Sequence, residues 1–368
     1  MGRQLVPFAL IRLIAFSLYN LAMMMLTHEQ LSQYALGVGL DLVGVAPAGP
    51  AGTWEAYRDW LAQGYAGGLA RYLARPDALA RRADPRRILP EARSVIVVAA
   101  SYAGAPLPPL PPLHGRVSRY AWGEDYHRWL LRRLKMLLQR LAVDKGAFPA
   151  RAYVDTGPIL ERDWAREAGL GWLGKHTNLI HPRWGSYLFL GVALVGLDCE
   201  PTSRPELPAC GSCTRCLDAC PSGALMAPGR LDARRCVAYL TIEHRGSIPV
   251  ELRPALGENL CGCDICQEVC PWNHKPLLAH QGERAPAAAT LYLPELLLMK
   301  AEEFRARFRQ TAIWRATPEG LARNAAVVLG NRGDPAAIPY LEQVVSSPRS
   351  DLLREHAAWA IQRIKSNA

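Results

Sequence analysis

Between residues 27 and 200 the apolar residues alternate between two spacings. Helical spacing, with apolar positions three or four residues apart, occurs over four segments, residues 28–37, 52–63, 126–143 and 159–169. Between them lie short apolar or β-branched runs typical of buried strands, at residues 42–46, 94–101, 152–156 and 186–197. Helices interspersed with strands predict a mixed α/β domain over residues 27–200.

The first 26 residues form a long apolar stretch that Arg12 and Asn20 interrupt. Such a stretch is compatible with a signal-like segment or a membrane anchor. It lacks a small-residue cleavage site and a twin arginine, and three consecutive methionines close it. Thr27 and Gln30 then predict an N-cap with a capping box, as at the natural start of a domain. We therefore expect translation to begin at an internal methionine, and we expect no stable membrane association.

The chain changes character twice after residue 200. Residues 201–284 show little periodicity and are rich in cysteine, so this predicted domain depends on what its cysteines bind. Within residues 285–368, the segments 321–330 and 353–362 align at an offset of 32, with paired alanines at matching positions. This favours a HEAT-like helical repeat domain. The alternative is an ordinary helical tail in which the alanines coincide by chance.

Nine of the ten cysteines lie between residues 210 and 270. Ten cysteines in 368 residues are too few for a disulfide scaffold, whereas such clustering is typical of a metal site. Free thiolates also require a reducing compartment, so we expect a cytoplasmic protein.

Two cysteine runs dominate this segment. The first places cysteines at 210, 213, 216 and 220 with proline at 221, which is the ferredoxin pattern for [4Fe–4S] clusters. The second places cysteines at 263, 266 and 270 with proline at 271, but position 260 is leucine. Zinc or a set of disulfides is the alternative to a ferredoxin-like module with two [4Fe–4S] clusters.

Two cubanes need eight thiolates, and the two runs supply seven, so Cys236 is the best candidate for the eighth. Cys261 competes with it, but a CxC pair is cramped on a cubane, and Cys199 is expected to be a buried structural thiol. We assign one cluster to Cys210, Cys213, Cys216 and Cys270, and the other to Cys220, Cys236, Cys263 and Cys266.

The formal net charge of +10 predicts an anionic partner. The chain has 37 arginines and 6 lysines, and the arginine fork suits phosphates and stacked bases. A codon bias towards arginine is the alternative explanation. Residues 115–151 and 300–368 both carry an excess of basic side chains, as expected for surfaces that follow a tRNA backbone.

Several long motifs resemble one family. They are "SRYAWGEDYH" (118–127), "YVDTGPILERDWAREAGLGWLGKHTNLI" (153–180), "YLTIEHRGSIP" (239–249) and "CGCDICQEVCPWN" (261–273), with the two cysteine runs. Together they resemble the epoxyqueuosine reductases, corrinoid iron–sulfur enzymes that complete the wobble base queuosine in tRNA. The resemblance covers about residues 24–365 and departs from the family in the apolar leader and in Cys261.

The resemblance implies base-off cobalamin in the α/β domain, with the two clusters relaying electrons to it from an external donor. The substrate would be epoxyqueuosine in a tRNA anticodon stem-loop, reduced by two electrons and dehydrated. Asp155 matches the family's proton donor, and Asp155, Lys175, Thr177 and Asn178 are expected to contact the cofactor.

A physical argument agrees with the role of Asp155. An oxygen that leaves carbon must be protonated, and an apolar ring beside a carboxyl would raise its pKa. The alternative is that Asp155 caps a helix that starts near Pro158. His127 and His176 have no partners at metal spacing and are expected to be ordinary polar or core residues.

Two other functions remain open. A corrinoid reductive dehalogenase would share the clusters and cobalamin, but such proteins resemble exported ones with a twin-arginine leader. A non-catalytic ferredoxin-like electron carrier would leave the large α/β domain without a role.

Overall fold

The computed structural model describes residues 25–104, 107, 109–203, 209–274, 289–348 and 350–367. Residues 1–24, which hold nearly all of the apolar leader, lie outside this set, so the predictions for the leader are not addressed by the structure. Among the helices that the structure describes, none is long and apolar enough to cross a membrane.

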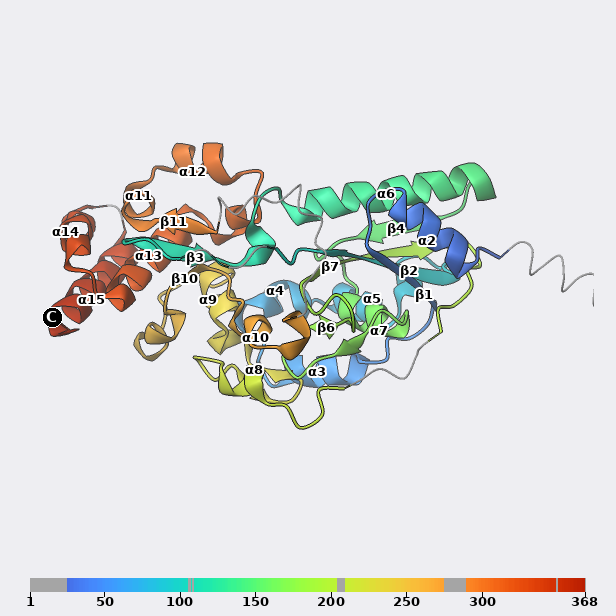
Figure 1. Ribbon diagram of the computed structural model, residues 1–368, viewed down its shortest axis with the longest axis horizontal. Helices are drawn as coiled ribbons and strands as arrows, with labels where there is room; N and C mark the ends of the chain where they lie inside the picture. Colours follow the sequence, from blue (N-terminus) through green and yellow to red (C-terminus); the bar gives the residue numbers. More distant parts are fainter. Residues whose placement is uncertain are drawn as a thin grey trace, which may run out of the picture.

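A four-stranded antiparallel sheet organises the first half of the chain (Figure 1). Its strands, in spatial order, are β1 (Leu42–Pro47), β2 (Ser94–Ser101), β7 (Leu188–Val195) and β4 (Ala150–Tyr153). Three of them confirm predicted strands, and β4 replaces the one predicted at 152–156, because it begins and ends earlier than the apolar run indicated. The four predicted helices are also confirmed, as α2 (His28–Leu36), α3 (Trp54–Ala62), α6 (Tyr126–Lys145) and α7 (Glu161–Glu167).

Both faces of this sheet are covered. Ile96 and Val98 of β2 face a core formed with α2 and α6, and the intervening Val95 and Val97 face a second core formed with α7. Side chains alternate between the faces of a strand, so a central strand covered on both sides must be apolar throughout. The unbroken apolar run of β2 therefore follows from its place in the sheet.

Local signals fix the start of this domain. The Thr27 hydroxyl accepts a hydrogen bond from the Gln30 backbone N–H, and the Gln30 side chain accepts one from the Thr27 N–H. The predicted capping box is thus confirmed.

Two further helices, α4 (Ala70–Leu73) and α5 (Pro76–Ala83), follow α3.

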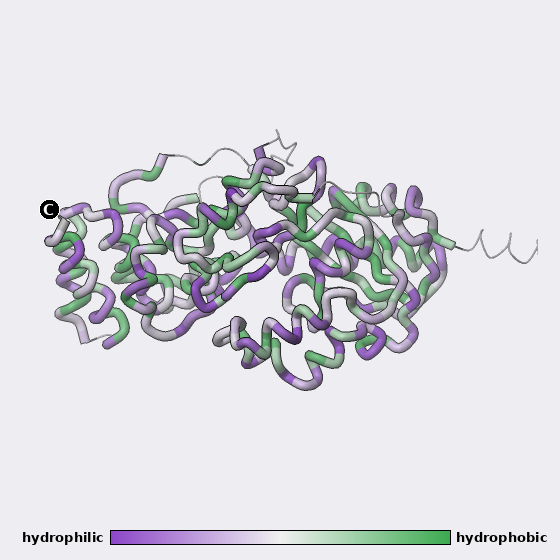
Figure 2. Tube along the Cα trace, turned by 90° about the horizontal axis from the view of Figure 1, so that it is seen from below, coloured by the Kyte–Doolittle hydropathy of each residue, from purple (hydrophilic) through white to green (hydrophobic). Residues whose placement is uncertain are grey.

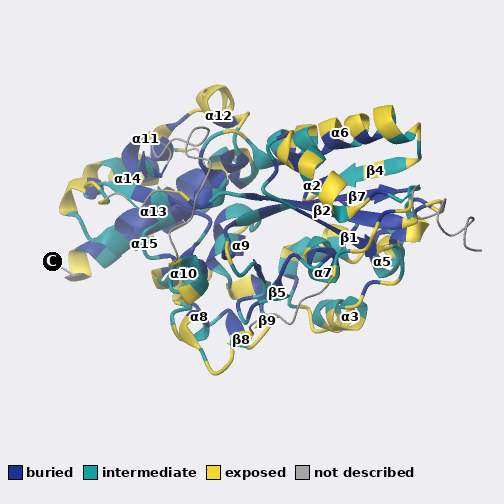
Figure 3. Ribbon diagram, turned by 45° about the vertical axis from the view of Figure 1, so that its right-hand side comes forward, coloured by how far each residue is buried: buried dark blue, intermediate teal, exposed yellow. Residues whose placement is uncertain are grey.

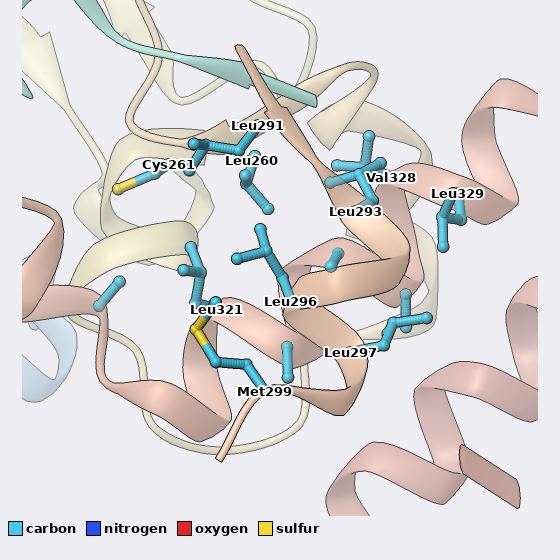
Figure 4. Packing of buried hydrophobic residues seen from close by; sticks show 14 of the residues in the cluster. Leu260, Cys261, Leu291, Leu293, Leu296, Leu297, Met299, Leu321, Val328 and Leu329 are labelled. Atoms are coloured by element: carbon cyan, nitrogen blue, oxygen red, sulfur yellow. The ribbon is translucent and has the colours of Figure 1, made fainter. Parts of the chain in front are cut away.

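A second sheet connects distant parts of the chain. Strand β3 (His114–Val117) pairs with β10 (Asn259–Cys261) in parallel and with β11 (Thr290–Tyr292) in antiparallel orientation. Figure 4 shows the core beside this sheet, where Leu260 and Leu291 meet Leu296. The three predicted domains therefore share a packed core, and their boundaries stay predictions.

The C-terminal region is helical. Its helices are α11 (Leu293–Leu298), α12 (Ala301–Phe308), α13 (Pro318–Arg332), α14 (Ile338–Val345) and α15 (Asp351–Asn367). The two aligned sequence segments lie in α13 and α15, which pack so closely that a Cβ at Gly330 would lie 2.8 Å from Ala360 Cα.

Burial distinguishes the two aligned helices. Figure 3 shows α13 as largely buried. The buried residues of α15 recur at helical spacing, at Leu353, Ala357, Ala360 and Ile364, and Figure 2 shows hydrophobic and hydrophilic residues alternating along the C-terminal helices. Helix α13 is therefore the central helix of this region, and α15 covers it with one apolar face.

The cysteine-rich segment packs between the sheet and these helices (Figure 1). Its regular elements are short, namely α8 (Arg215–Asp218), β8 (Leu225–Ala227), β9 (Arg230–Leu231), α9 (Val237–Ile242) and α10 (Ile265–Glu268). Arg323 and Asn324 of α13 are fully buried and donate to backbone carbonyls of α9 and β10, including Leu240 at 2.6 Å and Leu260 at 3.0 Å. Helix α13 thus ties the segment to the C-terminal region.

Replacing Leu134 by alanine tests the core beneath α6. The Leu134 side chain is fully buried against the sheet, so the cavity should lower the free energy of unfolding by about 2–5 kcal/mol. Met136→Ala on the exposed side of the same helix is the matched control and should change it by less than about 0.5 kcal/mol. Denaturant titration compares the two, and equal losses would contradict this packing.

Candidate active site and cysteine segment

Asp155 lies two residues beyond the end of β4, although the predicted strand over residues 152–156 included it. Its backbone has φ 60°, a left-handed conformation that costs energy for a residue other than glycine. Its N–H donates to Glu161 Oε1 at 2.5 Å, and 54% of its side chain is exposed. Helix α7 starts at Glu161 with Leu160 as N-cap, so the alternative that Asp155 caps this helix is wrong.

His127 lies between two carboxylates. Its Nε2 is 2.9 Å from Asp155 Oδ2, and its Nδ1 is 2.5 Å from Asp125 Oδ1. Asp125 is the N-cap of α6 and accepts the His127 backbone N–H, so the helix start fixes the ring. His127 is buried, as expected for a core residue, and it also contacts Asp155, which the sequence did not predict. The motif 118–127 already contained Asp125 and His127. No local pattern indicated that His127 would contact Asp155, which lies 28 positions further along the chain.

Neighbouring charges and hydrogen bonds shift the pKa values of Asp155 and His127. Burial would raise the pKa of Asp155, but the hydrogen bond and charge of His127 and the charge of Arg315 outweigh it and lower the pKa. The expected rise concerned Asp155 beside a bound ring, so it stays a prediction; in the protein alone, neighbouring charges lower the pKa. Burial would lower the pKa of His127, but its hydrogen bonds to Asp125 and Asp155 raise it.

Glu161 is the neighbouring acid with a raised pKa. Burial and the charge of Asp155 raise the pKa of Glu161 to about 8. One carboxylate of the pair therefore holds its charge while the other holds its proton, which is the usual result when two acids share a site.

The predicted cofactor contacts lie on the turn between β5 (Trp172–Leu173) and β6 (Leu179–Ile180). Thr177 has φ 70°, and its carbonyl and hydroxyl accept from Arg162 Nη1 at 2.7 and 3.3 Å. The Asn178 side chain forms no hydrogen bond with the residues that the structure describes. The turn is thus held against α7, and the amide of Asn178 is available to a ligand.

Lys175 of the same turn contacts the first cysteine run. Its Nζ donates to the carbonyls of Gly211 at 2.7 Å and Cys213 at 2.9 Å. This contact ties the turn to the first cysteine run. Contact of Lys175 with cobalamin stays a prediction, and the ammonium already has two protein partners.

His176 is 3% exposed, as expected for a core residue. Its Nδ1 accepts the Asn178 backbone N–H at 3.2 Å, and its buried Nε2 has no hydrogen-bond partner among the described residues. Burial lowers the pKa of His176 to about 4, so the ring is neutral at physiological pH.

The cysteines fall into two neighbouring groups. Beyond the effect of burial, charge on Cys210, Cys213 and Cys270 raises the pKa of Cys216, and Cys210 and Cys213 act likewise on Cys270. In the other group, the charges of Cys220 and Cys236 raise the pKa of Cys263. The charges of Cys263 and Cys236 raise the pKa of Cys266. The charge of Cys216 also raises the pKa of Cys266, so the two groups adjoin. Each group falls within one of the two predicted ligand sets, which stay predictions.

The spacing within each group bears on what it can hold. All ten cysteines are free thiols, so none forms a disulfide. No three cysteine, histidine or carboxylate side chains among the described residues converge on one ion. Zinc draws its thiolates to about 2.3 Å, whereas a cubane attaches four thiolates to four different iron atoms and accepts wider spacing.

Two cysteines lie apart from these groups. Cys199 is buried, and burial raises its pKa to about 11, which agrees with a structural thiol. Cys261 is fully buried in β10 within the apolar core of Figure 4, and burial raises its pKa to about 12. Cys261 thus lies in the apolar core and outside both groups, while its exclusion as a ligand stays a prediction.

Comparison with known proteins identifies the family. Residues 82–156 match the family described as "Epoxyqueuosine reductase QueG, DUF1730", and residues 209–273 match the "4Fe-4S double cluster binding domain". The epoxyqueuosine reductase of Pseudomonas aeruginosa is 38% identical over 344 residues, covering 91% of this chain and 94% of the relative. The chain belongs to the epoxyqueuosine reductase family.

Solved structures of epoxyqueuosine reductases agree with this. One, crystallised with an epoxyqueuosine-modified tRNA-Tyr stem loop, has 33% identity and a TM-score of 0.84, covering 91% of this chain and 89% of that one. Another, from Bacillus subtilis, has 32% identity and a TM-score of 0.82, covering 91% and 90%. The relative from Escherichia coli is 38% identical over 90% of this chain and 88% of its own length.

Membership of the epoxyqueuosine reductase family decides between the functions that the sequence left open. The protein is an oxidoreductase that reduces epoxyqueuosine to queuosine. The matched double-cluster domain spans both cysteine runs, so the protein binds iron–sulfur clusters. The dehalogenase and electron-carrier alternatives are not supported.

The raised pKa of Glu161 predicts a pH-dependent stability. Because the folded state holds this proton up to about pH 8, stability should fall as pH rises from about 4.5, the ordinary pKa of the group, through 8. Glu161→Gln keeps an oxygen that can accept the Asp155 N–H and should flatten this part of the profile.

Denaturation midpoints measured between pH 5 and 9 test this, with the exposed Glu55→Gln as control. Profiles of equal slope in the wild type and Glu161→Gln would contradict it.

Proposed function

We propose that this protein acts on epoxyqueuosine at the wobble position of tRNA, with cobalamin fed by two [4Fe–4S] clusters and with Asp155 as the proton donor. The observation that carries the proposal is the placement of Asp155. Its carboxylate is half exposed, yet the strained loop after β4, His127 and Glu161 hold it in one position. A fixed, accessible carboxyl is what general acid catalysis requires.

The reaction defines what the acid must do. Converting an epoxide to an alkene takes two electrons and two protons and releases water. The departing oxygen needs a proton at each C–O cleavage, and Asp155 supplies it from the end of β4. The related structure from Bacillus subtilis is described with an aspartate-bearing catalytic loop swung out of its active site.

The α/β domain offers groups that suit a corrinoid beside Asp155. Asn178 has a half-buried amide without a partner among the described residues, and Thr177 is held in place by Arg162. These two residues would hold the amide groups on the rim of cobalamin, bound base-off. When bound, cobalamin supplies strongly reducing electrons to the substrate carbon.

The cysteines would carry those electrons. We assign Cys210, Cys213, Cys216 and Cys270 to one cubane, and Cys220, Cys236, Cys263 and Cys266 to the other. Their mutual proximity supports both sets, and the closeness of Cys216 to Cys266 supports transfer between the clusters. An external low-potential donor would reduce them.

Basic surfaces suit the tRNA partner. Arg128, Lys135 and Arg140 are exposed along α6, and the C-terminal region adds further arginines. Such side chains neutralise phosphates without reading sequence. A HEAT-like repeat of α13 to α15 would extend this surface, and a cytoplasmic location would bring the protein together with tRNA. The half-exposed Trp314 offers a ring for an unstacked base.

Asp155→Asn tests the acid. The amide cannot donate an acidic proton, so turnover of epoxyqueuosine stem-loop should fall about 10²–10⁴-fold. Iron and cobalt contents should stay unchanged, because no proposed cluster ligand is altered. Normal turnover in this variant would rule out the acid role and leave the family assignment intact.

Cys236→Ser tests the eighth ligand. Because the second cluster would lose a thiolate, the variant should retain roughly half of its iron and sulfide after anaerobic purification. Cys261→Ser is the matched control and should retain all of it, since Cys261 lies in the apolar core. Full iron in the first variant, or loss in the second, would refute the assignment.

A further inference from the structure

The reaction consumes two protons, while a single carboxyl carries one. Asp155 must therefore be protonated again within each turnover. We infer that His127, hydrogen-bonded between Asp125 and Asp155, is the positioning residue that supplies this proton. The inference rests on the proposed role of Asp155 as the acid.

The geometry requires a proton on each ring nitrogen of His127. Nδ1 lies 2.5 Å from one carboxylate oxygen and Nε2 lies 2.9 Å from another. A neutral imidazole has one N–H, so it would present a lone pair to an ionised carboxylate at one of these contacts. The imidazolium donates to both. The ring therefore stores a proton 2.9 Å from the acid that needs it.

The surroundings set the direction of transfer. The His127 side chain is 10% exposed and that of Asp125 is 16% exposed, whereas Asp155 is 54% exposed. The stored proton thus sits on the buried side and the acid faces outward. Asp125 Oδ1 accepts both the His127 ring and its backbone N–H, and the Asp125 N–H donates to the Gln310 carbonyl at 2.8 Å. The ring is therefore held on its inner side while Asp155 reacts on its outer side.

The other titratable and charged groups near His127 and Asp155 come from five elements, and one of them is Tyr120 of the 3₁₀ helix η3 (Arg119–Ala121), which interacts with Asp155. Tyr126 of α6 donates to Asp155, and Glu161 and Arg162 begin α7. Arg315 of the 3₁₀ helix η9 (Ala312–Ala316) lies close enough to oppose the charge on His127, and Tyr72 of α4 lies near Asp155. Asp125 and Asp155 are the acceptors of the imidazolium, and they outweigh Arg315.

The proton steps balance. At rest Asp155 is a carboxylate and His127 is an imidazolium. His127 passes its Nε2 proton to Asp155, which gives it to the departing oxygen, and the neutral ring keeps its Nδ1–H bond to Asp125. Solvent then recharges His127, and the same two transfers deliver the second proton, so that the oxygen leaves as water while the carbon–carbon double bond forms. Two electrons from the external donor balance the two protons taken from solvent, and both residues end the turnover in the states in which they began it.

His127→Gln separates proton supply from positioning. The glutamine amide can donate to Asp155 but cannot act as an acid at physiological pH. With epoxyqueuosine stem-loop as substrate, we expect kcat to fall about 10- to 100-fold with KM unchanged. The alkaline limb of the kcat–pH profile that reports His127 should disappear. His114→Gln, at a position that forms no contact with this group, is the control.

Asp125→Asn gives a second, independent variant. Asparagine is an equally good N-cap, so α6 should start normally, but the ring loses one charged acceptor. The pKa of His127 should then fall, and the alkaline limb should move to lower pH with near-normal kcat on its acidic side. In ¹⁵N-histidine spectra of the cluster-loaded protein at pH 7, wild-type His127 should carry protons on both ring nitrogens.

Several outcomes would overturn the inference. They are a wild-type kcat and pH profile in His127→Gln, an unmoved alkaline limb in Asp125→Asn, or a singly protonated ring in the spectra. If His127→Gln lost its clusters or its thermal midpoint, Asp125→Asn and the spectra would decide. Normal turnover in Asp155→Asn would refute the proposed acid instead, and the spectra of His127 would be unaffected by that failure.

Discussion

One imidazole ring joins the parts of the chain that the site needs. Through its two nitrogens, His127 connects the start of α6 to the loop after β4, and through Asp125 it reaches the carbonyl of Gln310 in the C-terminal region. Because the loop holds Asp155 in a strained conformation, the conformation persists only while these contacts oppose its relaxation. The position of the acid therefore depends on this hydrogen-bonded group.

The cysteine segment is held in a similar way by contacts from outside it. Lys175 binds two carbonyls of the first cysteine run, and Arg323 with Asn324 binds carbonyls of α9 and β10. A segment with such short helices and strands buries too little apolar surface to fix its own fold. These polar contacts place the electron-carrying cysteines beside the turn that carries Thr177 and Asn178, so the proposed electron path and the proposed acid belong to one packed unit.

Neighbouring charges, as well as burial, set the pKa of the proposed acid. In the protein without a bound ring, His127 and Arg315 lower the pKa of Asp155. Hydrogen bonds to Asp125 and Asp155 raise the pKa of His127, and burial raises that of Glu161 to about 8. An acid that is easily ionised can still serve when a protonated neighbour recharges it, because the supply of protons then matters as much as the pKa of the donor.

The amino-acid sequence by itself determined the elements and the chemistry of the cysteines. The periodicity of residues 28–37 and 126–143 and the spacing of Cys210 to Cys220 are local, so neighbours in the chain suffice to interpret them. Only the tertiary structure decided the strand order, the partners of His127 and the contacts of Lys175. These depend on residues 28 and 38 positions apart, and no local pattern records which distant side chains packing will bring together.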